Sequence, residues 1–200
     1  MKETVEPFGR PGADEYHEYY GRYIGQVPGG DVLELLERQM SETAALLLAV
    51  PAARETHRYA ADKWTIREVV GHVLDSERVF GLRALHIARG DPAALPSFDQ
   101  EEWARASNAG RRPLTDLTNE LVAVRRSHVL LFRGMAPEAA TRRGVASGRE
   151  FTVRSLAWII AGHERHHVRT LIERYGVDGE SAASQPGRHH SPSESGRVLK

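Results

Sequence analysis

Apolar residues recur every three or four positions along four long stretches of the chain, which is the spacing of one face of an α-helix. The first stretch follows Asp31, and the second opens at Thr65, which forms a capping-box pattern with Glu68. The third begins at Leu114 and the fourth at Thr152. The apolar faces include Val32, Leu35, Leu36, Met40, Ala44, Leu47 and Leu48 in the first stretch, Ile66, Val69, Val70, Val73, Phe80 and Ala84 in the second, Leu117, Leu121, Val124, His128 and Leu131 in the third, and Leu156, Ile159 and Ile160 in the fourth.

The residues that follow these stretches are ones that end helices. Pro51 closes the first helix, because the residue before a proline avoids the helical conformation. Glycine is common just past a helix end, so the second helix is expected to run to Gly90 and the fourth to Tyr175 and Gly176. The third is expected to end at Met135. No stretch shows the two-residue period of a β-strand, so the sequence predicts an all-α four-helix bundle.

Two connections and the two chain ends lack this pattern. Residues 91–113 give an irregular signal in which FDQEEWARA could form a short helix, and residues 137–150 are predicted to be a turn-rich connection. Residues 1–30 carry prolines, glycines and a cluster of tyrosines, so they are expected to form an arm packed on the bundle of residues 31–176. Residues 177–200 are rich in Gly, Ser and Pro, which predicts a disordered tail.

The composition narrows the range of functions. A chain of 200 residues suits one domain, and 27 basic residues balance 27 acidic ones. This balance argues against nucleic acid or an anionic membrane as a partner. The sequence also lacks a long apolar span and the apolar core of a secretory signal, so a cytoplasmic protein is expected.

The chain contains no cysteine and 10 histidines. The lack of cysteine excludes a disulfide scaffold, a thiolate zinc site and a cysteine nucleophile. Histidine titrates near neutral pH and is the commonest metal ligand, so it is the main source of chemistry in this chain.

His163 and His167 lie four residues apart in the fourth predicted helix, one turn above each other on one face. That face also carries Ile159 and Ile160, so both imidazoles are expected to point toward the core. A single core histidine is best explained by a hydrogen bond to a backbone carbonyl. An inward pair on a rigid helix instead favours a metal site, because two nitrogens converge at little entropic cost.

A third ligand has to come from another helix, and the residues alone leave its identity open. His72, at the edge of the apolar face of the second helix, is the best candidate. His128 on the third helix and His86 near the end of the second are rivals, because the sequence does not show which helices are neighbours. The other histidines lie in the arm or loops, beside the pair, or in the tail: His17, His57, His166, His189 and His190.

The string HERHH also matches the H-E-x-x-H pattern of metalloproteases, with Glu164 in the position of the general base. The extended form of that pattern requires glycine and histidine where this chain has Thr170 and Glu173. Another form takes a carboxylate from a following helix, but only the low-complexity tail follows Gly176. The protease is therefore a minor alternative.

Three strings carry a resemblance to a known family: DKWTIREVVGHVLDSERVF, LPSFDQEEWA and LAWIIAGHERHHVRTL. Their order and spacing resemble the DinB-like superfamily of four-helix bundles, and within it the YfiT-type metal-dependent hydrolases and the thiol S-transferases. The likeness extends from Tyr16 to Tyr175. It implies a divalent metal ion, typically zinc or nickel, held by His72, His163 and His167. It also implies a small-molecule substrate, in some branches a low-molecular-weight thiol such as bacillithiol or mycothiol, and a homodimer, as in many relatives.

Three neutral imidazoles would leave coordination positions open, as in catalytic metal sites and unlike closed structural ones. Such an ion can activate water or hold a thiol as thiolate at neutral pH, and without cysteine in the chain the thiol must come with the substrate. We therefore expect S-transfer to, or hydrolysis of, a small molecule. A non-catalytic metal-binding bundle that acts through a partner is the alternative. Because the ligands must be neutral, metal affinity is expected to fall below a pH of about 6.

Two acidic residues are candidates for orienting the ligands. Glu77 falls inside the apolar face of the second helix, where a role near the metal and a buried salt bridge to an arginine explain it equally well. Glu164, next to His163, is the other candidate.

The entrance to the site is expected to be walled by residues 91–113. Phe98 and Trp103 in this segment are candidate lining residues, whereas Trp64 and Trp158 are expected in the core.

Overall fold

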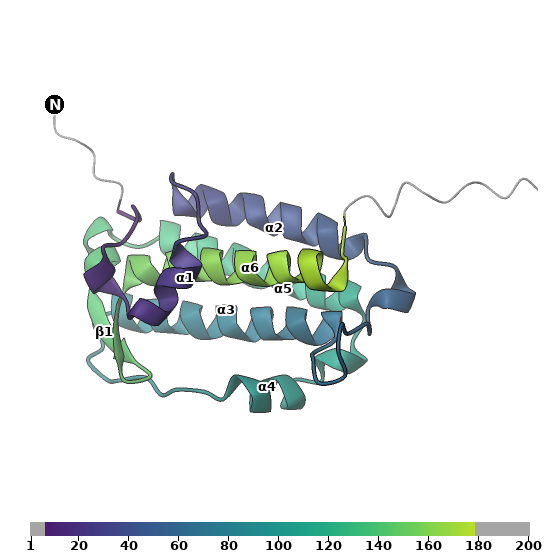
Figure 1. Cartoon of the computed structure of the whole chain (residues 1–200). Helices are drawn as coiled ribbons and strands as arrows, with labels where there is room; N and C mark the ends of the chain where they lie inside the picture. Colours follow the sequence, from purple (N-terminus) through teal and green to yellow (C-terminus); the bar gives the residue numbers. More distant parts are fainter. Residues whose placement is uncertain (1–6, 179–200) are drawn as a thin grey trace, which may run out of the picture.

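The computed structural model describes residues 7–178, which form helices and one β-hairpin (Figure 1). In this part of the chain four long helices build the bundle: α2 (Val32–Leu48), α3 (Ile66–Ala88), α5 (Leu114–Arg133) and α6 (Val153–Tyr175). Two helices are short, α1 (Gly21–Ile24) and α4 (Gln100–Ala106), and 3₁₀ turns lie at Ala13–Glu15, Glu18–Tyr20, Ala52–Arg54, Ala109–Arg111 and Pro137–Thr141. The predicted four-helix bundle is confirmed.

The helix ends follow the capping signals of the sequence. The Glu68 N–H donates to Thr65 Oγ1 (3.2 Å), and the Thr65 N–H donates to the Glu68 carboxylate (2.7 Å), so α3 begins just after Thr65. Gly176 ends α6 in the left-handed conformation, with a φ of 62°. α5 ends at Arg133, slightly before the predicted Met135.

The connection between α5 and α6 contains an antiparallel hairpin, and the expectation that no strand occurs is wrong here. β1 (Arg143–Ala146) pairs with β2 (Arg149–Thr152). The turn residues Ser147 and Gly148 both have positive φ, 53° and 68°, which is the conformation that joins strands through two residues. Strands of four residues are too short for a two-residue period to stand out in the sequence.

The packing of the long helices decides which residues can meet. α3 lies against both α5 and α6, and α2 packs mainly on α5 and also on α6. α3 and α6 run side by side over most of their length (Figure 1). Side chains on the facing sides of these two helices can therefore form one site.

The arm packs on α6 and brings its aromatic residues to the bundle. Phe8 and Ile24 are buried, and the Trp158 indole N–H donates to the Phe8 carbonyl (2.9 Å). Gly162 permits the closest approach, because a Cβ at this position would lie 2.2 Å from the Tyr23 carbonyl oxygen. The arm is thus held against the middle of α6.

At the other end of the chain the core continues beyond α6. Val177 is buried, and its N–H donates to the Leu171 carbonyl (3.1 Å), so the first residue of the expected tail belongs to the packed structure. The predicted disorder of the tail lies outside the described residues, as do His189 and His190. None of the helices in residues 7–178 combines the length and the apolar composition of a membrane span.

Candidate metal centre

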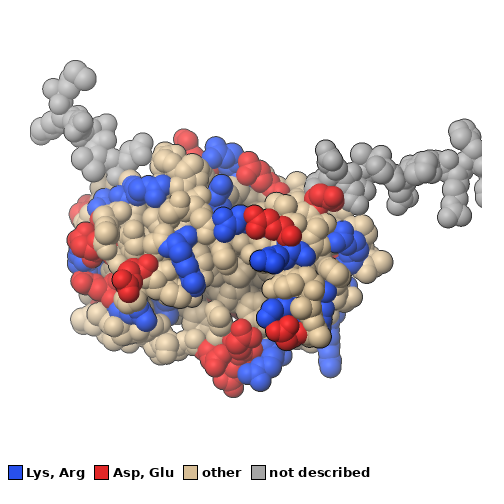
Figure 2. Space-filling view, in the orientation of Figure 1, with Lys and Arg blue, Asp and Glu red and all other residues tan. Residues whose placement is uncertain are grey.

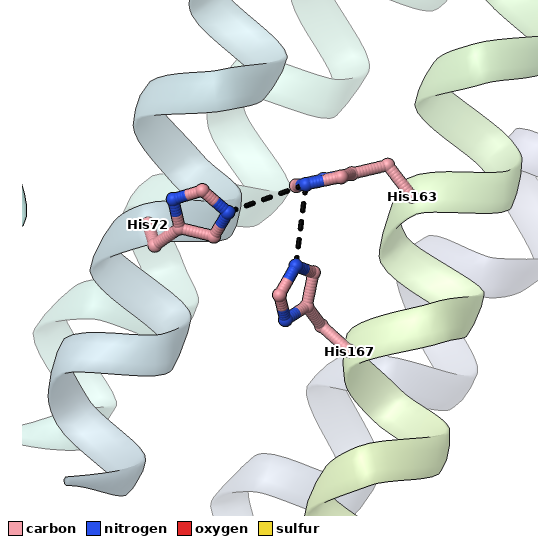
Figure 3. A group of neighbouring side chains, drawn as sticks. All are labelled: His72, His163 and His167. Carbon is pink, nitrogen blue, oxygen red and sulfur yellow. Dashed lines mark hydrogen bonds between the residues drawn. The ribbon is translucent and has the colours of Figure 1, made fainter. Parts of the chain in front are cut away.

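Three histidines from α3 and α6 point toward one another between these two helices (Figure 3). His163 Nε2 lies 3.3 Å from His72 Nε2 and 3.2 Å from His167 Nε2. One ligand nitrogen from each of the three lies within 4.8 Å of the other two. The structure therefore brings His163 and His167 of α6 together with His72 of α3. His72 was the best of three candidates for the third ligand on the residues alone.

The spacing of these nitrogens suits metal coordination. Nitrogens that bind a tetrahedral ion at 2.0–2.1 Å lie about 3.3 Å from one another. A neutral imidazole nitrogen is either a donor or an acceptor, so His163 Nε2 cannot make a full hydrogen bond to both of its neighbours. A cation shared by all three lone pairs accounts for the convergence better than hydrogen bonding does.

Burial keeps the three side chains in the form that binds metals. His72 and His163 are buried, and His167 is partly buried. Burial lowers the pKa of His72 to about 4 and holds the pKa of His163 well below its usual range. Burial, together with the nearby His72 and His166, lowers the pKa of His167 to about 3. All three imidazoles are therefore neutral at pH 7, with lone pairs available.

Aromatic rings surround the three histidines and restrict their movement. The Trp64 ring packs on His72 with a centroid distance of 4.8 Å, and the Phe80 ring lies 5.8 Å from His163. Tyr23 of the arm packs edge-on against His163 at 5.3 Å. Trp64 thus belongs to the site as well as to the edge of the core. The arm, which was expected only to pack on the bundle, also contributes Tyr23 to the site.

A pocket of about 330 Å³ opens onto His72 and His167. Its walls come from the arm, the segment before α3, α4 and the outer turns of α6. The face seen in Figure 1 is hollowed above the acidic residues that gather over α4 (Figure 2). Gln100 and Glu101 of α4 line the pocket, so residues 91–113 do contribute a wall, as predicted.

The aromatic residues expected at this entrance lie elsewhere. Phe98 and Trp103 pack on each other with a centroid distance of 4.8 Å, and they line a separate cavity of about 110 Å³ beside Leu82. Their predicted place at the entrance is wrong. α4 turns its polar side to the histidine pocket, and periodicity in so short a helix could not show which side faces inward.

Glu77 forms a buried salt bridge, which was one of the two explanations for a carboxylate inside the apolar face of this helix. Arg125 Nε and Nη2 donate to the Glu77 carboxylate at 2.7 Å and 2.9 Å, and His128 Nδ1 lies 3.4 Å from it. Burial would raise the pKa of Glu77, but the charge of Arg125 and the hydrogen bonds of Arg125 and His128 outweigh burial and lower it. His128 therefore contacts Glu77 and lies outside the group of three histidines.

Glu164 belongs to the same buried network. Its carboxylate forms a salt bridge with Arg125 Nη2 (2.7 Å) and accepts a hydrogen bond from Gln39 Nε2 (3.1 Å). Among the contacts of residues 7–178, neither Glu77 nor Glu164 bonds to one of the three histidines. The network joins all four long helices, and the position of Glu164 does not suit a general base in the pocket.

Within residues 7–178, two further histidines make their hydrogen bonds away from the three. His86 bonds to the Ala93 carbonyl (2.7 Å), and His17 Nδ1 accepts a hydrogen bond from the Tyr19 N–H (3.2 Å). His166 lines the pocket beside the site. One pocket residue that the sequence did not single out is Arg22 of the arm, whose charge contributes to the lowered pKa of His166 after burial and Arg169.

Comparisons with known proteins agree with this fold. No curated protein matches the chain. The solved structure of YfiT from Bacillus subtilis, described as a probable metal-dependent hydrolase with an unusual four-helix bundle topology, is 17% identical in sequence and superposes with a TM-score of 0.63. The match covers 87% of this chain and 100% of YfiT. The sequence profile of the DinB superfamily matches residues 35–171, which include all three histidines of the site. This chain therefore belongs to the DinB superfamily.

Proposed function

We propose that the protein is a metal-dependent enzyme in which His72, His163 and His167 hold one divalent ion, zinc or nickel, at the floor of the pocket. The observation that carries this proposal is the convergence of three neutral imidazoles beside an open pocket. The Nε2 atom of His163 lies 3.3 Å from that of His72 and 3.2 Å from that of His167. Three nitrogen ligands without a protein carboxylate suit a catalytic ion with open positions. A structural site would be closed on all sides.

The bound ion would supply Lewis acidity that activates water or a thiol in the pocket. The chain's own residues supply the rest. Burial keeps the three imidazoles neutral, each with one lone pair, and the rings of Trp64, Phe80 and Tyr23 hold them in place. Burial and the neighbouring Tyr19 raise the pKa of Tyr23 to about 12, so its hydroxyl stays protonated at neutral pH. A pocket of about 330 Å³ suits a small substrate.

The reaction proposed is S-transfer from a low-molecular-weight thiol, or hydrolysis of a small molecule. With no cysteine in the chain, the sulfur of an S-transfer must enter with a substrate. The carboxylate of Glu164 is bound to Arg125 and Gln39, which disfavours the alternative of an H-E-x-x-H protease.

The proposal is tested by the metal content of the purified protein and of His72→Ala. We expect one divalent ion per chain in the intact protein and less than about a tenth of that in the variant, because a site with two histidines loses most of its affinity. His86→Ala is the matched control, because His86 lies on the same helix but bonds to the Ala93 carbonyl. A His72→Ala protein that keeps its metal at full stoichiometry contradicts the three-histidine site.

Activity is tested separately, with the metal-loaded protein. Incubation with bacillithiol, mycothiol or glutathione and a chlorinated electrophile should consume thiol if the protein transfers sulfur, and ester substrates test for hydrolysis. A protein that binds one ion but turns over none of these substrates would favour the non-catalytic bundle.

A further inference from the structure

Arg22 is a cation of the pocket wall that has no acidic partner in the described part of the chain. It lies in α1 and lines the pocket together with His72 and His167. The other cation of the wall, Lys63, is paired with Asp62 at 2.6 Å. Within residues 7–178, no carboxylate lies at salt-bridge distance from Arg22.

The guanidinium of Arg22 is held in place by two tyrosines. Its Nη2 donates to the Tyr23 hydroxyl (3.0 Å). The guanidinium carbon lies 3.8 Å from the centroid of the Tyr19 ring and 4.8 Å from that of Tyr23. Stacking on rings leaves the edge of the planar group free, and a guanidinium carries five N–H donors. Most of these donors remain for a ligand in the pocket.

Tyr23 links this cation to the three histidines. Its ring packs edge-on against His163, with a centroid distance of 5.3 Å, and its backbone lies against Gly162, where a Cβ would be only 2.2 Å away. The tyrosine that binds Arg22 is thus fixed on the helix turn that carries His163. Packing of Tyr23 therefore fixes the backbone from which Arg22 extends, although the Arg22 side chain itself is exposed.

We propose that Arg22 determines specificity by binding an oxyanion of the substrate, a carboxylate or a phosphate, while the reacting group of the same molecule faces the three histidines. A planar guanidinium with free N–H donors recognises such groups through paired hydrogen bonds. The placement of the reacting group at the three histidines rests on the proposed function. The contact between Arg22 and the oxyanion does not, because it needs no metal.

The oxyanion contact is tested first on the metal-free protein. Calorimetric titrations with succinate and with inorganic phosphate are compared for the intact protein, Arg22→Gln and Arg169→Gln. The control, Arg169→Gln, removes the same charge from a residue of α6 that does not line the pocket. We expect at least one probe to bind the intact protein, to bind Arg22→Gln at least tenfold more weakly, and to bind the control within twofold of the intact protein. The probe that binds more tightly distinguishes carboxylate from phosphate recognition.

Failure of both probes to bind the intact protein, or equal binding to Arg22→Gln, would overturn the inference. An equal loss of affinity in both variants would also overturn it, because the effect would then follow overall charge.

The second test uses the zinc-loaded protein and two thiols of similar size, mercaptosuccinate and the neutral 1-thioglycerol. We expect Arg22→Gln to weaken mercaptosuccinate binding by about tenfold and to leave 1-thioglycerol unchanged, whereas a merely structural role would weaken both. If neither thiol binds the intact zinc-loaded protein while the result on the metal-free protein holds, the thiol part of the proposed function fails and the role of Arg22 stands.

Discussion

Burial of the three histidines has a cost for the folded protein at acidic pH. His72 has a pKa of about 4 and His167 of about 3, and that of His163 also lies well below its usual value. In the unfolded chain each is expected to have a pKa of about 6.5. Protons therefore compete with a metal for the folded site only when the pH approaches these lowered pKa values. The loss of metal affinity is then expected at a lower pH than the value of about 6 that unperturbed imidazoles predict.

The stability of the metal-free protein should consequently depend on pH. A group with a lowered pKa binds fewer protons when folded, so stability is lost as the pH falls below the unfolded value of about 6.5. We expect a loss of about 1.5 kcal/mol per buried histidine between pH 6.5 and 5. Urea denaturation at several pH values measures this slope, and His72→Gln should make it shallower. A slope that His72→Gln leaves unchanged would show that His72 is not buried in the neutral form.

At the scale of the elements, the bundle is held together beneath the metal centre by one buried charge network. Arg125 of α5 lies between Glu77 of α3 and Glu164 of α6, and Arg125 Nη1 also donates to the Leu36 carbonyl of α2 (3.2 Å). Burial alone would lower the pKa of Arg125, but the two carboxylates outweigh burial and raise it. The network therefore carries buried charges that compensate one another.

Removal of the central cation should be costly. Arg125→Met leaves the buried carboxylates of Glu77 and Glu164 without their arginine counter-charge, and we expect it to lower the free energy of unfolding by about 3–5 kcal/mol. The combined variant Glu77→Gln, Arg125→Met and Glu164→Gln should recover much of this loss, because no buried charge remains. Chemical denaturation compares the two. A cost of less than about 1 kcal/mol for Arg125→Met would mean that the network is open to water.

The contact between the arm and α6 depends on one glycine. A Cβ on Gly162 would collide with the Tyr23 backbone, whereas a Cβ on Gly29 would meet nothing within 4 Å. Gly162→Ala should therefore lower stability by about 1–3 kcal/mol and displace Tyr23 from His163, with weaker zinc binding as a result. Gly29→Ala is the control. Thermal unfolding and zinc titration together check this. Unchanged zinc binding in a destabilised Gly162→Ala protein would show that the position of the arm does not affect the metal site.

At the scale of the whole molecule, the sequence predicts what depends on local pattern. The four long helices could be predicted because each buries one face, and the convergence of His163 and His167 could be predicted because a helix places them one turn apart. The meeting of His72 with this pair depends on α3 and α6 being neighbours, which no local pattern records. A salt bridge of Glu77 to an arginine could be predicted as one of two explanations, but its partner Arg125 could not, since the two residues are far apart in the chain. The place of Arg22 in the pocket wall could not be predicted either, because it depends on the packing of the arm against α6 at Gly162.

The central claim is that one divalent ion sits among His72, His163 and His167. The most direct measurement is the anomalous diffraction of a crystal of the zinc-loaded protein, recorded on both sides of the zinc absorption edge. We expect one strong peak, about 2.0–2.1 Å from the Nε2 atoms of all three histidines. A zinc-loaded protein with no peak at this position, or with zinc bound by His163 and His167 but not by His72, would contradict the account.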